Sequence, residues 1–492
     1  MLVRFGLAAL SGLLTFAAFP GVGAWPLAFV AWAPLLLALA GMPVRKAASL
    51  GFVAGLFAAL PGLRFLYPVL RAESGLGPIA CAAVVLAVAL YHALRGLLIG
   101  VVSRVWSDDT APPSLSFIAG LAASEIAVPS LFPWYFGASV HDVPLFLQPA
   151  ELFGPVGVSV VLALSSVALA ETISAIREHR GTRPRVIVTA IAIPIVAAFW
   201  GSLRIPMIDA RGRESPAITV GVVQPNIARG GEIEIVQHHR EATRELVSKG
   251  ADLVVWAEGA LPWTVPAPLA DEVHAMLKVP DVPLLTGALV QGAPGPEAST
   301  RVSNSALLFD GGHLAGRYDK HRLLPFSESL PFERTFPWLR DLSPRSGDFA
   351  PGDTYAPLRL HGRAMAVFIC YEDLFPGHVR ALSRGRDVEL LVNLTNDSWF
   401  QGTDEPRVHL ALAKLRAVEQ RKYLVRATLT GKSAIVDPAG RLLGAVPEDR
   451  AGTLLAEVHW MRGNTLYNLI GDTPWWIFVI VVLAWKYGRR EA

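Results

Sequence analysis

The sequence predicts a membrane protein of the α/β class, in which a bundle of about eight spanning helices carries one polar domain. Three observations lead to this fold class. The chain has 492 residues, of which 52% are hydrophobic and only 17% are charged, whereas a soluble domain carries about 25% charged residues. Apolar stretches of roughly 20 residues recur near both ends. Charged residues gather between about 204 and 465, where strand-like and helix-like runs alternate.

Apolar stretches long enough to cross a bilayer divide the chain. Because a spanning helix needs about 20 mostly apolar residues, we expect about seven spans within 1–203 and a last one within 472–488. The candidate spans are 5–19, 24–41, 47–67, 76–102, 114–129, 155–176, 185–202 and 473–487. The first stretch could instead be a cleaved signal peptide, but further spans follow it at once. The fifth could dip into the bilayer without crossing it.

Basic residues near the ends of the spans set the expected orientation. Arg45 and Lys46 separate the second and third spans, Arg104 follows the fourth, and Lys486 ends the last. If the spans alternate, all of these lie on one side, which the positive-inside rule makes cytoplasmic. Both termini are then cytoplasmic and the polar domain is extracytoplasmic. The net charge of +3 is too small to indicate nucleic-acid binding, so we expect no such partner.

Two acidic residues lie close to the apolar spans. Glu125 is near the end of the fifth span and Glu151 is near the start of the sixth. Ionisable groups at membrane depth are candidates for function. The alternative is that both side chains reach water.

The polar part, residues 216–462, has the pattern of a layered α/β domain. Strand-like runs occupy 218–224, 252–257, 283–288, 304–310, 363–370, 388–393, 423–428 and 432–437. Helix-like runs lie near 232–249, 373–384 and 406–421. This alternation favours an α/β architecture, and about 245 residues suffice for one sizeable core.

Three polar residues each follow a strand-like run in this part. Glu258 follows 253–257, Lys320 comes shortly after the run that starts at His313, and Cys370 ends an apolar run. A thiolate is a nucleophile, a glutamate can remove its proton, and a lysine can stabilise an oxyanion. The alternative is a small buried cysteine and two solvated strand edges. The only other cysteine is Cys81, in an apolar stretch, so no disulfide framework is indicated.

The polar part shows no metal-ligand spacing. His238 and His239 are adjacent rather than four residues apart on a helix, and we interpret them as surface residues.

Five segments of the chain resemble a known family. Trp256–Pro262 is similar to the catalytic-glutamate segment of apolipoprotein N-acyltransferases, Tyr318–Glu328 resembles their lysine segment, and Ile369–Glu372 resembles their nucleophile segment. Asn396–Phe400 and Arg416–Glu419 resemble two further family segments. The resemblance covers essentially the whole chain, including eight spans around one nitrilase-like domain.

The resemblance implies a fold, a place and a reaction. The fold is a four-layer α-β-β-α domain on the outer face of a bacterial inner membrane. The reaction moves an acyl chain from a phospholipid to the free N-terminal amine of an S-diacylglyceryl cysteine on an apolipoprotein, through a thioester. The partners are therefore the phospholipid donor, the apolipoprotein acceptor and membrane lipids. We expect a monomer, and the reaction requires no metal or organic cofactor.

The resemblance also assigns roles to single residues. It makes Glu258 the general base, Lys320 the oxyanion lysine and Cys370 the nucleophile. The accessory and substrate-binding residues that it implies are Glu328, Tyr371, Glu372, Trp399 and Phe400.

Several positions depart from the family pattern, and two of them bear on the substrates. Gln401 stands where a glycine usually follows Trp-Phe, and Leu429 stands where an asparagine is expected. These departures leave donor and acceptor preference open. Residues 323–355, rich in proline and aromatic residues, are long for a plain loop. They either pack into the core or form an arm that gates lipid entry.

Two other functions remain open from the sequence. The same triad would hydrolyse an amide if water replaced the amine, which describes a membrane-tethered nitrilase-like amidase. It could also acylate another amine acceptor. A non-catalytic lipid-binding or transport protein would require the triad to be incidental and polar residues to line a path through the spans.

Overall fold

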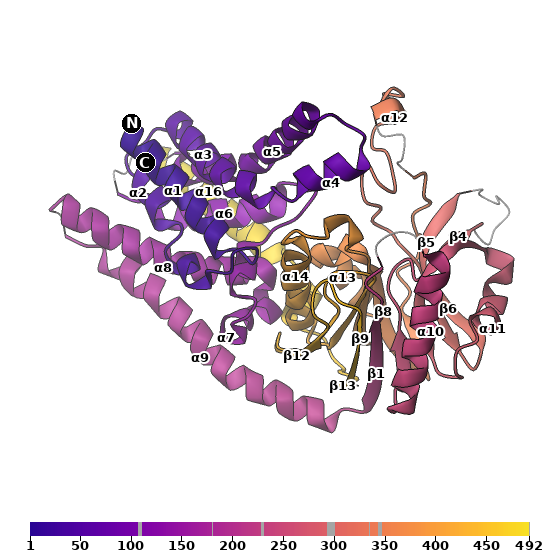
Figure 1. Ribbon diagram of the computed structural model, residues 1–492. Coiled ribbons are helices and arrows are strands. Elements are labelled where there is room, and N and C mark those ends of the chain that lie inside the picture. The colour runs from indigo at the N-terminus through magenta and orange to yellow at the C-terminus, as the bar shows by residue number, and fades with distance from the viewer. Residues whose placement is uncertain are drawn as a thin grey trace. The chain divides into compact units, whose positions relative to one another are not determined.

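The computed structural model describes residues 1–106, 111–179, 181–227, 231–292, 301–333, 335–342 and 347–491. The chain forms two compact units (Figure 1). The first unit comprises Met1–Pro206 and Leu469–Ala492, and the second comprises Met207–Asn468.

The first unit is a bundle of apolar helices. Among the described residues, four helices are long and apolar enough to cross a membrane: α3 (Val44–Gly62), α5 (Pro78–Arg104), α8 (Ala150–Arg177) and α9 (Pro184–Glu214). Shorter apolar segments, Leu2–Ala18, Trp25–Leu39, Ser114–Ala127 and Thr473–Gly488, lie where the other four spans are predicted. The presence of membrane-type helices is thus confirmed, and the count of eight spans stays a prediction.

The remaining elements of this unit range from single turns to helices of 17 and 19 residues. They are α1 (Leu2–Ala18), η1 (Trp25–Phe29), α2 (Ala33–Leu39), α4 (Leu66–Glu73), α6 (Ser114–Ala127), η2 (Phe136–Val140), α7 (Pro144–Leu147) and α16 (Thr473–Glu491). The predicted span 24–41 is not one continuous helix. Pro26 and Pro34 each lie in the first turn of a separate element, because proline lacks the N–H that a helix interior requires.

Helices α3 and α5 pack with their backbones in contact. A Cβ atom on Gly51 would lie 2.1 Å from the carbonyl oxygen of Gly96, and one on Gly96 would lie 2.2 Å from that of Gly51. Only glycine fits at this crossing. Such close approach supplies the van der Waals contact that joins helices in lipid, where no hydrophobic driving force acts between them.

Buried carboxylates of the first unit are held by hydrogen bonds. Glu151 is only 4% exposed, and its two oxygens accept hydrogen bonds from Arg204 at 2.7 and 3.0 Å. Glu125 is 8% exposed. The alternative that these two side chains reach water is therefore wrong.

The second unit contains two β-sheets. The first sheet has the order β13 (Gly452–His459), β1 (Ala217–Gln224), β2 (Leu253–Val255), β4 (Leu284–Gln291), β5 (Val302–Asp310) and β6 (His313–Asp319), with β3 (Leu261–Pro266) also paired to β4. The second has the order β12 (Leu442–Ala445), β11 (Ala434–Val436), β10 (Leu424–Thr428), β9 (Val388–Thr395), β8 (Arg363–Ile369) and β7 (Leu358–Leu360). In each sheet the central strands run parallel.

Helices cover the outer faces of the two sheets. The first sheet packs against α10 (Glu232–Ser248), and the second packs against α13 (Pro376–Ser383) and α14 (Glu405–Gln420). The sheets contact each other through β1 with β10 and β5 with β8. The layers therefore follow the order helix, sheet, sheet, helix. Short elements complete the unit: η3 (Ala267–Glu272), α11 (Val273–Leu277), α12 (Leu339–Leu342), η4 (Cys370–Leu374), η5 (Ser398–Phe400) and α15 (Leu466–Ile470).

The strands that the sequence predicts most clearly are those that lie in the buried core. All residues of β9 and β10 are buried, as expected for parallel strands covered on both faces. The prediction that His239 lies at the surface is wrong. It is fully buried on α10, and its ring centre lies 4.6 Å from that of Trp256.

Candidate active site

Cys370 lies where strand β8 ends and the chain turns into η4. The apolar residues Ala364–Ile369 are all buried, so the strand is fixed between its neighbours β7 and β9. Cys370 itself has φ = +54°, a conformation that is uncommon for a residue with a side chain. Such strain persists only where surrounding contacts impose it, and it clusters at functional sites.

A network of buried polar side chains from β9 and β10 holds the turn at Cys370. The side-chain amide of Asn393 donates hydrogen bonds to the carbonyl oxygens of Cys370 at 3.2 Å and Phe368 at 3.3 Å. The amide oxygen of Asn393 accepts from Arg426 at 2.5 Å, and Arg426 also donates to Asp373 at 2.6 Å. The carbonyl groups around Cys370 are therefore held by side chains from β9 and β10.

Glu372 ties the turn to the segment that carries Lys320. One carboxylate oxygen accepts from the backbone N–H groups of His321 at 2.8 Å and Arg322 at 2.9 Å. The other accepts from the Ile369 N–H at 2.7 Å and the Tyr318 hydroxyl at 2.8 Å. Although burial opposes ionisation, His378 and the backbone N–H groups of Arg322 and Ile369 lower the pKa of Glu372 to about 2. The carboxylate is fully buried, so it holds backbone rather than facing solvent.

Glu258 and Lys320 meet at the ends of two strands of the first sheet. Glu258 follows β2 and Lys320 follows β6. Lys320 Nζ lies 3.3 Å from Glu258 Oε1, and only 1% of the lysine side chain is exposed. The sequence placed both residues at strand ends, and the structure brings them into one ion pair.

Glu328 completes a cluster around the lysine. Its Oε1 accepts a hydrogen bond from Lys320 Nζ at 2.9 Å, and its Oε2 accepts from the Leu324 N–H at 2.8 Å. Glu328 is 7% exposed. Lys320 thus lies between two carboxylates, which hold the ammonium group in one position.

Asn304 is a member of this cluster that sequence reasoning missed. Its side-chain amide donates to Glu258 Oε1 at 2.7 Å and to Glu328 Oε1 at 2.8 Å. Its signal in the sequence was weak, because it is one polar residue within β5, a strand whose residues are mostly buried. By bridging the two glutamates, Asn304 fixes their separation as well as their orientation.

The charges of this cluster act on the Cys370 thiol. Burial raises the pKa of the thiol, Glu258 raises it further, and Lys320 opposes both. Burial also raises the pKa of Glu258, against the attraction of Lys320. For Lys320, burial alone would lower the pKa, but Glu258 and Glu328 raise it well above its usual value. The resting state therefore has a charged lysine and a protonated thiol, and Glu258 is one of the carboxyl groups whose charge acts on that thiol.

The remaining predicted residues surround this cluster to different degrees. Tyr371 is buried, its hydroxyl donates to the Leu323 carbonyl at 2.8 Å, and its ring lies 5.8 Å from Lys320 Nζ. Trp399 and Phe400 lie on η5, just after β9, and Trp399 is 39% exposed. Tyr371 thus belongs to the buried site, whereas the Trp399 side chain reaches the surface.

Two family models match the chain. The model for carbon-nitrogen hydrolases matches residues 219–462, and the model for the N-terminal domain of apolipoprotein N-acyltransferases matches residues 11–168. Among solved structures, an amidase from Nesterenkonia sp. aligns with 50% of this chain and 91% of its own, at 21% identity and a TM-score of 0.37.

Curated relatives span the full chain. An apolipoprotein N-acyltransferase from Geobacter metallireducens is 32% identical over 504 residues, covering 99% of this chain and 95% of that protein. The enzyme of that name from Caulobacter vibrioides is 31% identical, with 82% and 78% covered, and the one from Vibrio cholerae is 27% identical, with 98% and 97% covered. Because a relative at this identity extends over nearly the whole chain, the protein belongs to the apolipoprotein N-acyltransferase family.

Proposed function

We propose that this protein transfers an acyl chain from a phospholipid to the N-terminal amine of an S-diacylglyceryl cysteine on apolipoproteins. One observation carries the proposal. The Cys370 thiol, at a strand end with strained backbone, lies close enough to the buried Lys320 for the lysine charge to act on it, and two carboxylates hold that lysine. Such a set suits nucleophilic acyl transfer. The relatives named apolipoprotein N-acyltransferases support the choice of donor and acceptor.

The first half-reaction forms a thioester. Glu258 accepts the thiol proton while the Cys370 sulfur attacks the ester carbonyl carbon of the phospholipid. The Lys320 ammonium stabilises the oxyanion that develops on the carbonyl oxygen. The carbon–oxygen ester bond then breaks, and the leaving glycerol oxygen takes its proton from Glu258. A lysophospholipid departs and the acyl group stays on sulfur.

The second half-reaction forms the amide. The neutral N-terminal amine of the acceptor attacks the thioester carbonyl, and Glu258 removes a proton from the nitrogen. The carbon–sulfur bond breaks, and the sulfur of Cys370 recovers a proton from Glu258. Because donor and acceptor react in turn at one sulfur, ping-pong kinetics follow. Asn304 and Glu328 keep Glu258 and Lys320 in place through both halves.

We propose that aromatic side chains in the segment after Lys320 form the lipid-contacting surface. In the segment that follows Lys320, four large aromatic residues are exposed, which excludes core packing as their role: Phe326 (54%), Phe332 (74%), Phe336 (47%) and Trp338 (56%). With Trp399 and Phe400, they would take up the acyl chains of the donor, because exposed apolar patches mark membrane or ligand contacts.

We also propose a topology. Residues 1–203 cross the inner membrane about seven times and residues 472–488 cross it once more, so residues 216–462 form the catalytic domain on the periplasmic side. Both termini are cytoplasmic, and the protein acts as a monomer. The position of basic residues at the span ends supports this orientation. Protease added to spheroplasts should then cleave within the catalytic domain. Cleavage only after permeabilisation would reverse the orientation.

Intact-protein mass spectrometry tests the chemistry. The purified protein, mixed with a phospholipid, should gain the mass of one acyl chain, and hydroxylamine should remove it. Cys370→Ala should gain none, whereas Cys81→Ala serves as the matched control and should gain it in full. Absence of an adduct in the unsubstituted protein with every phospholipid tried would refute the thioester with this donor and favour the amidase reaction.

A further inference from the structure

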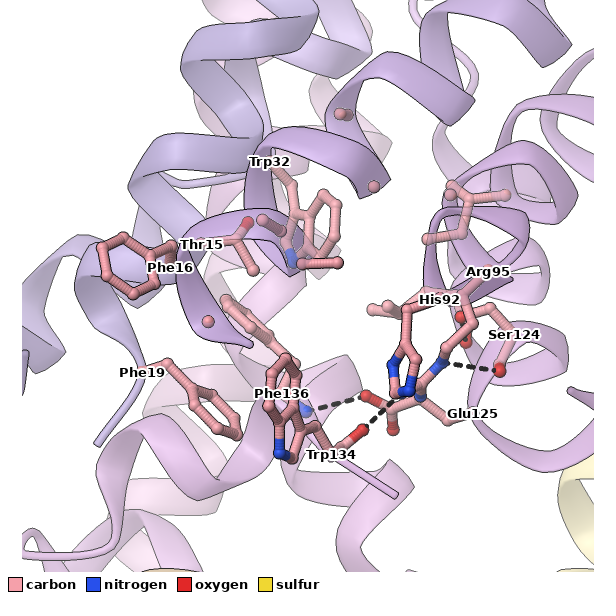
Figure 2. A pocket seen from close by; sticks show the side chains of 18 residues that line it. Thr15, Phe16, Phe19, Trp32, His92, Arg95, Ser124, Glu125, Trp134 and Phe136 are labelled. Carbon is pink, nitrogen blue, oxygen red and sulfur yellow. Dashed lines mark hydrogen bonds between the residues drawn. The ribbon is translucent and has the colours of Figure 1, made fainter. Parts of the chain in front are cut away.

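The first unit contains a cavity of about 110 Å³ that the proposed chemistry does not use. Helices α1, α3, α5 and α6 contribute to its wall, together with residues from the segment that follows α6. Figure 2 shows that its two ends differ. His92, Arg95 and Glu125 gather at one end, whereas Phe16 and Phe19 lie at the other. The cavity is therefore amphipathic within a bundle of apolar helices.

Local hydrogen bonds fix the polar end. Arg95 donates to the backbone carbonyl oxygens of Ser124 at 3.1 Å and Trp134 at 2.7 Å. Glu125 Oε1 accepts from the Phe136 N–H at 2.8 Å and from the Ser159 hydroxyl at 2.9 Å. One carboxylate oxygen and one guanidinium are thus anchored to the backbone, so the end of the cavity is preformed.

Two buried polar atoms at this end lack a partner. Within the part of the chain that the structure describes, neither Glu125 Oε2 nor His92 Nε2 has a hydrogen-bond partner. Glu125 is 8% exposed and His92 is 4% exposed. A buried polar atom without a partner is costly. Among the described residues, the indole N–H groups of Trp32 and Trp134, which also line the cavity, lack partners as well. These atoms on the wall of one cavity point to a ligand that supplies the missing bonds.

The charges of the polar end restrict the chemistry of that ligand. A cationic head would meet the Arg95 guanidinium, and an anionic head would meet the carboxyl oxygen of Glu125 that has no partner. A hydroxyl group avoids both repulsions, because it can donate to Glu125 Oε2 and accept from His92. The aromatic end would accept hydrocarbon. The volume of about 110 Å³ is several times the roughly 10–15 Å³ that one bound water requires, which leaves room for a head group.

We propose that this cavity binds a membrane amphiphile with an uncharged, hydroxyl-bearing head of the monoacylglycerol type. The head lies between His92 and Glu125, and the chain extends toward Phe16 and Phe19. The cavity belongs entirely to the first unit, whereas Cys370 belongs to the second. The binding site therefore stands independently of the proposed acyl transfer.

Native mass spectrometry of the full chain in detergent tests this site. The Cys370→Ala protein is titrated with monooleoylglycerol, so that no acyl transfer through Cys370 can occur. Methyl oleate, which lacks hydroxyl groups, and oleate, which is anionic, are the comparison ligands. Glu125→Gln replaces the carboxyl group with an amide, and Ala58→Phe fills the cavity from α3. Glu151→Gln is the matched control, because this buried carboxylate does not line the cavity.

The expected result is one bound monooleoylglycerol, with neither comparison ligand retained. Glu125→Gln should weaken binding about tenfold, as expected for the loss of one buried hydrogen bond. Ala58→Phe should abolish binding, and Glu151→Gln should leave it unchanged. Thermal unfolding of each variant shows whether it folds. If Glu125→Gln fails to fold, the binding result for Ala58→Phe decides the proposal.

Three results would overturn the proposal. The first is equal binding by the protein with and without Ala58→Phe, which would place the lipid elsewhere. The second is equal binding of methyl oleate, which would remove the role of the hydroxyl. The third is no bound lipid at saturating monooleoylglycerol, which would leave a cavity filled with water alone. None of these results bears on the thioester test, so the two proposals fail separately.

Discussion

Asn304 provides a sharp test of the active-site cluster, because it touches both glutamates without reaching the reacting sulfur in the proposed mechanism. Replacing it with leucine keeps the approximate size of the side chain and removes the donor. Glu258 Oε1 then loses a bond of 2.7 Å and Glu328 Oε1 loses one of 2.8 Å. The Asn304 bond lowers the pKa of Glu258, so its loss raises that pKa.

The size of the effect follows from the energy of the lost bond. A hydrogen bond to a charged group contributes about 1.5–3 kcal/mol, and about 1.4 kcal/mol is a factor of ten. Glu258 must be ionised to accept the thiol proton. On the acid side of the pH profile, the ionised fraction of Glu258, and with it the acylation rate, should therefore fall about tenfold or more in Asn304→Leu.

The assay is the single-turnover rate of Cys370 acylation as a function of pH. Asn304→Leu should move the acid limb of the profile to higher pH and change the rate at the plateau much less. Asn468→Leu is the matched control, because this buried asparagine of the same unit donates to the neutral side chain of Gln420 at 2.6 Å. An acid limb in the same place for Asn304→Leu would refute the assignment of Glu258 as the base.

Three further substitutions test other parts of the site. In Glu372→Gln, about 3 kcal/mol of unfolding free energy should be lost at neutral pH, because a pKa of about 2 instead of 4.5 stabilises the fold by that order. This contribution is present above about pH 4.5 and is lost as the pH falls toward 2. Denaturant titration at several pH values measures it, and an unfolding free energy with the same pH dependence in the variant as in the unsubstituted protein would contradict it. Lys320→Met should lower kcat about 10²–10³-fold with little change in KM, and a change in KM alone would exclude the oxyanion role. In Gly287→Ala the new Cβ atom would lie 2.6 Å from the Ala257 carbonyl oxygen, which should cost about 1–3 kcal/mol and slow acylation, whereas Gly377→Ala, with nothing within 4 Å, should do neither.

The buried strands of the second unit could be predicted from the sequence, whereas its edges could not. The runs that became β8, β9 and β10 are mostly apolar, as is typical of strands covered on both faces. Strands β7 and β12 were missed, because they are short and partly exposed and their pairing depends on neighbours distant in sequence. Strand β13 also escaped, although it pairs along the whole of β1.

The residues of the candidate site divide in the same way into those that the sequence predicts and those that it does not. Glu258, Lys320 and Cys370 could be predicted as candidates, because each ends a strand-like run or comes soon after one. Asn304 could not, since its role depends on two carboxylates that approach it from other segments. The cavity of the first unit was equally hidden. Glu125 stood out as an acidic residue near a span, but its relation to His92 exists only once α5 and α6 pack together.

Glu372 has a consequence for how this protein fails on heating. Lys320 follows a strand of the first sheet and Cys370 follows a strand of the second, yet one carboxylate holds backbone N–H groups of both segments. The sheets cannot slide apart while that carboxylate keeps its bonds, and its bonds cannot break without exposing a buried charge. Loss of activity and loss of the double-sheet structure should therefore coincide in one thermal transition, so the enzyme passes from active to unfolded without an intact but inactive form.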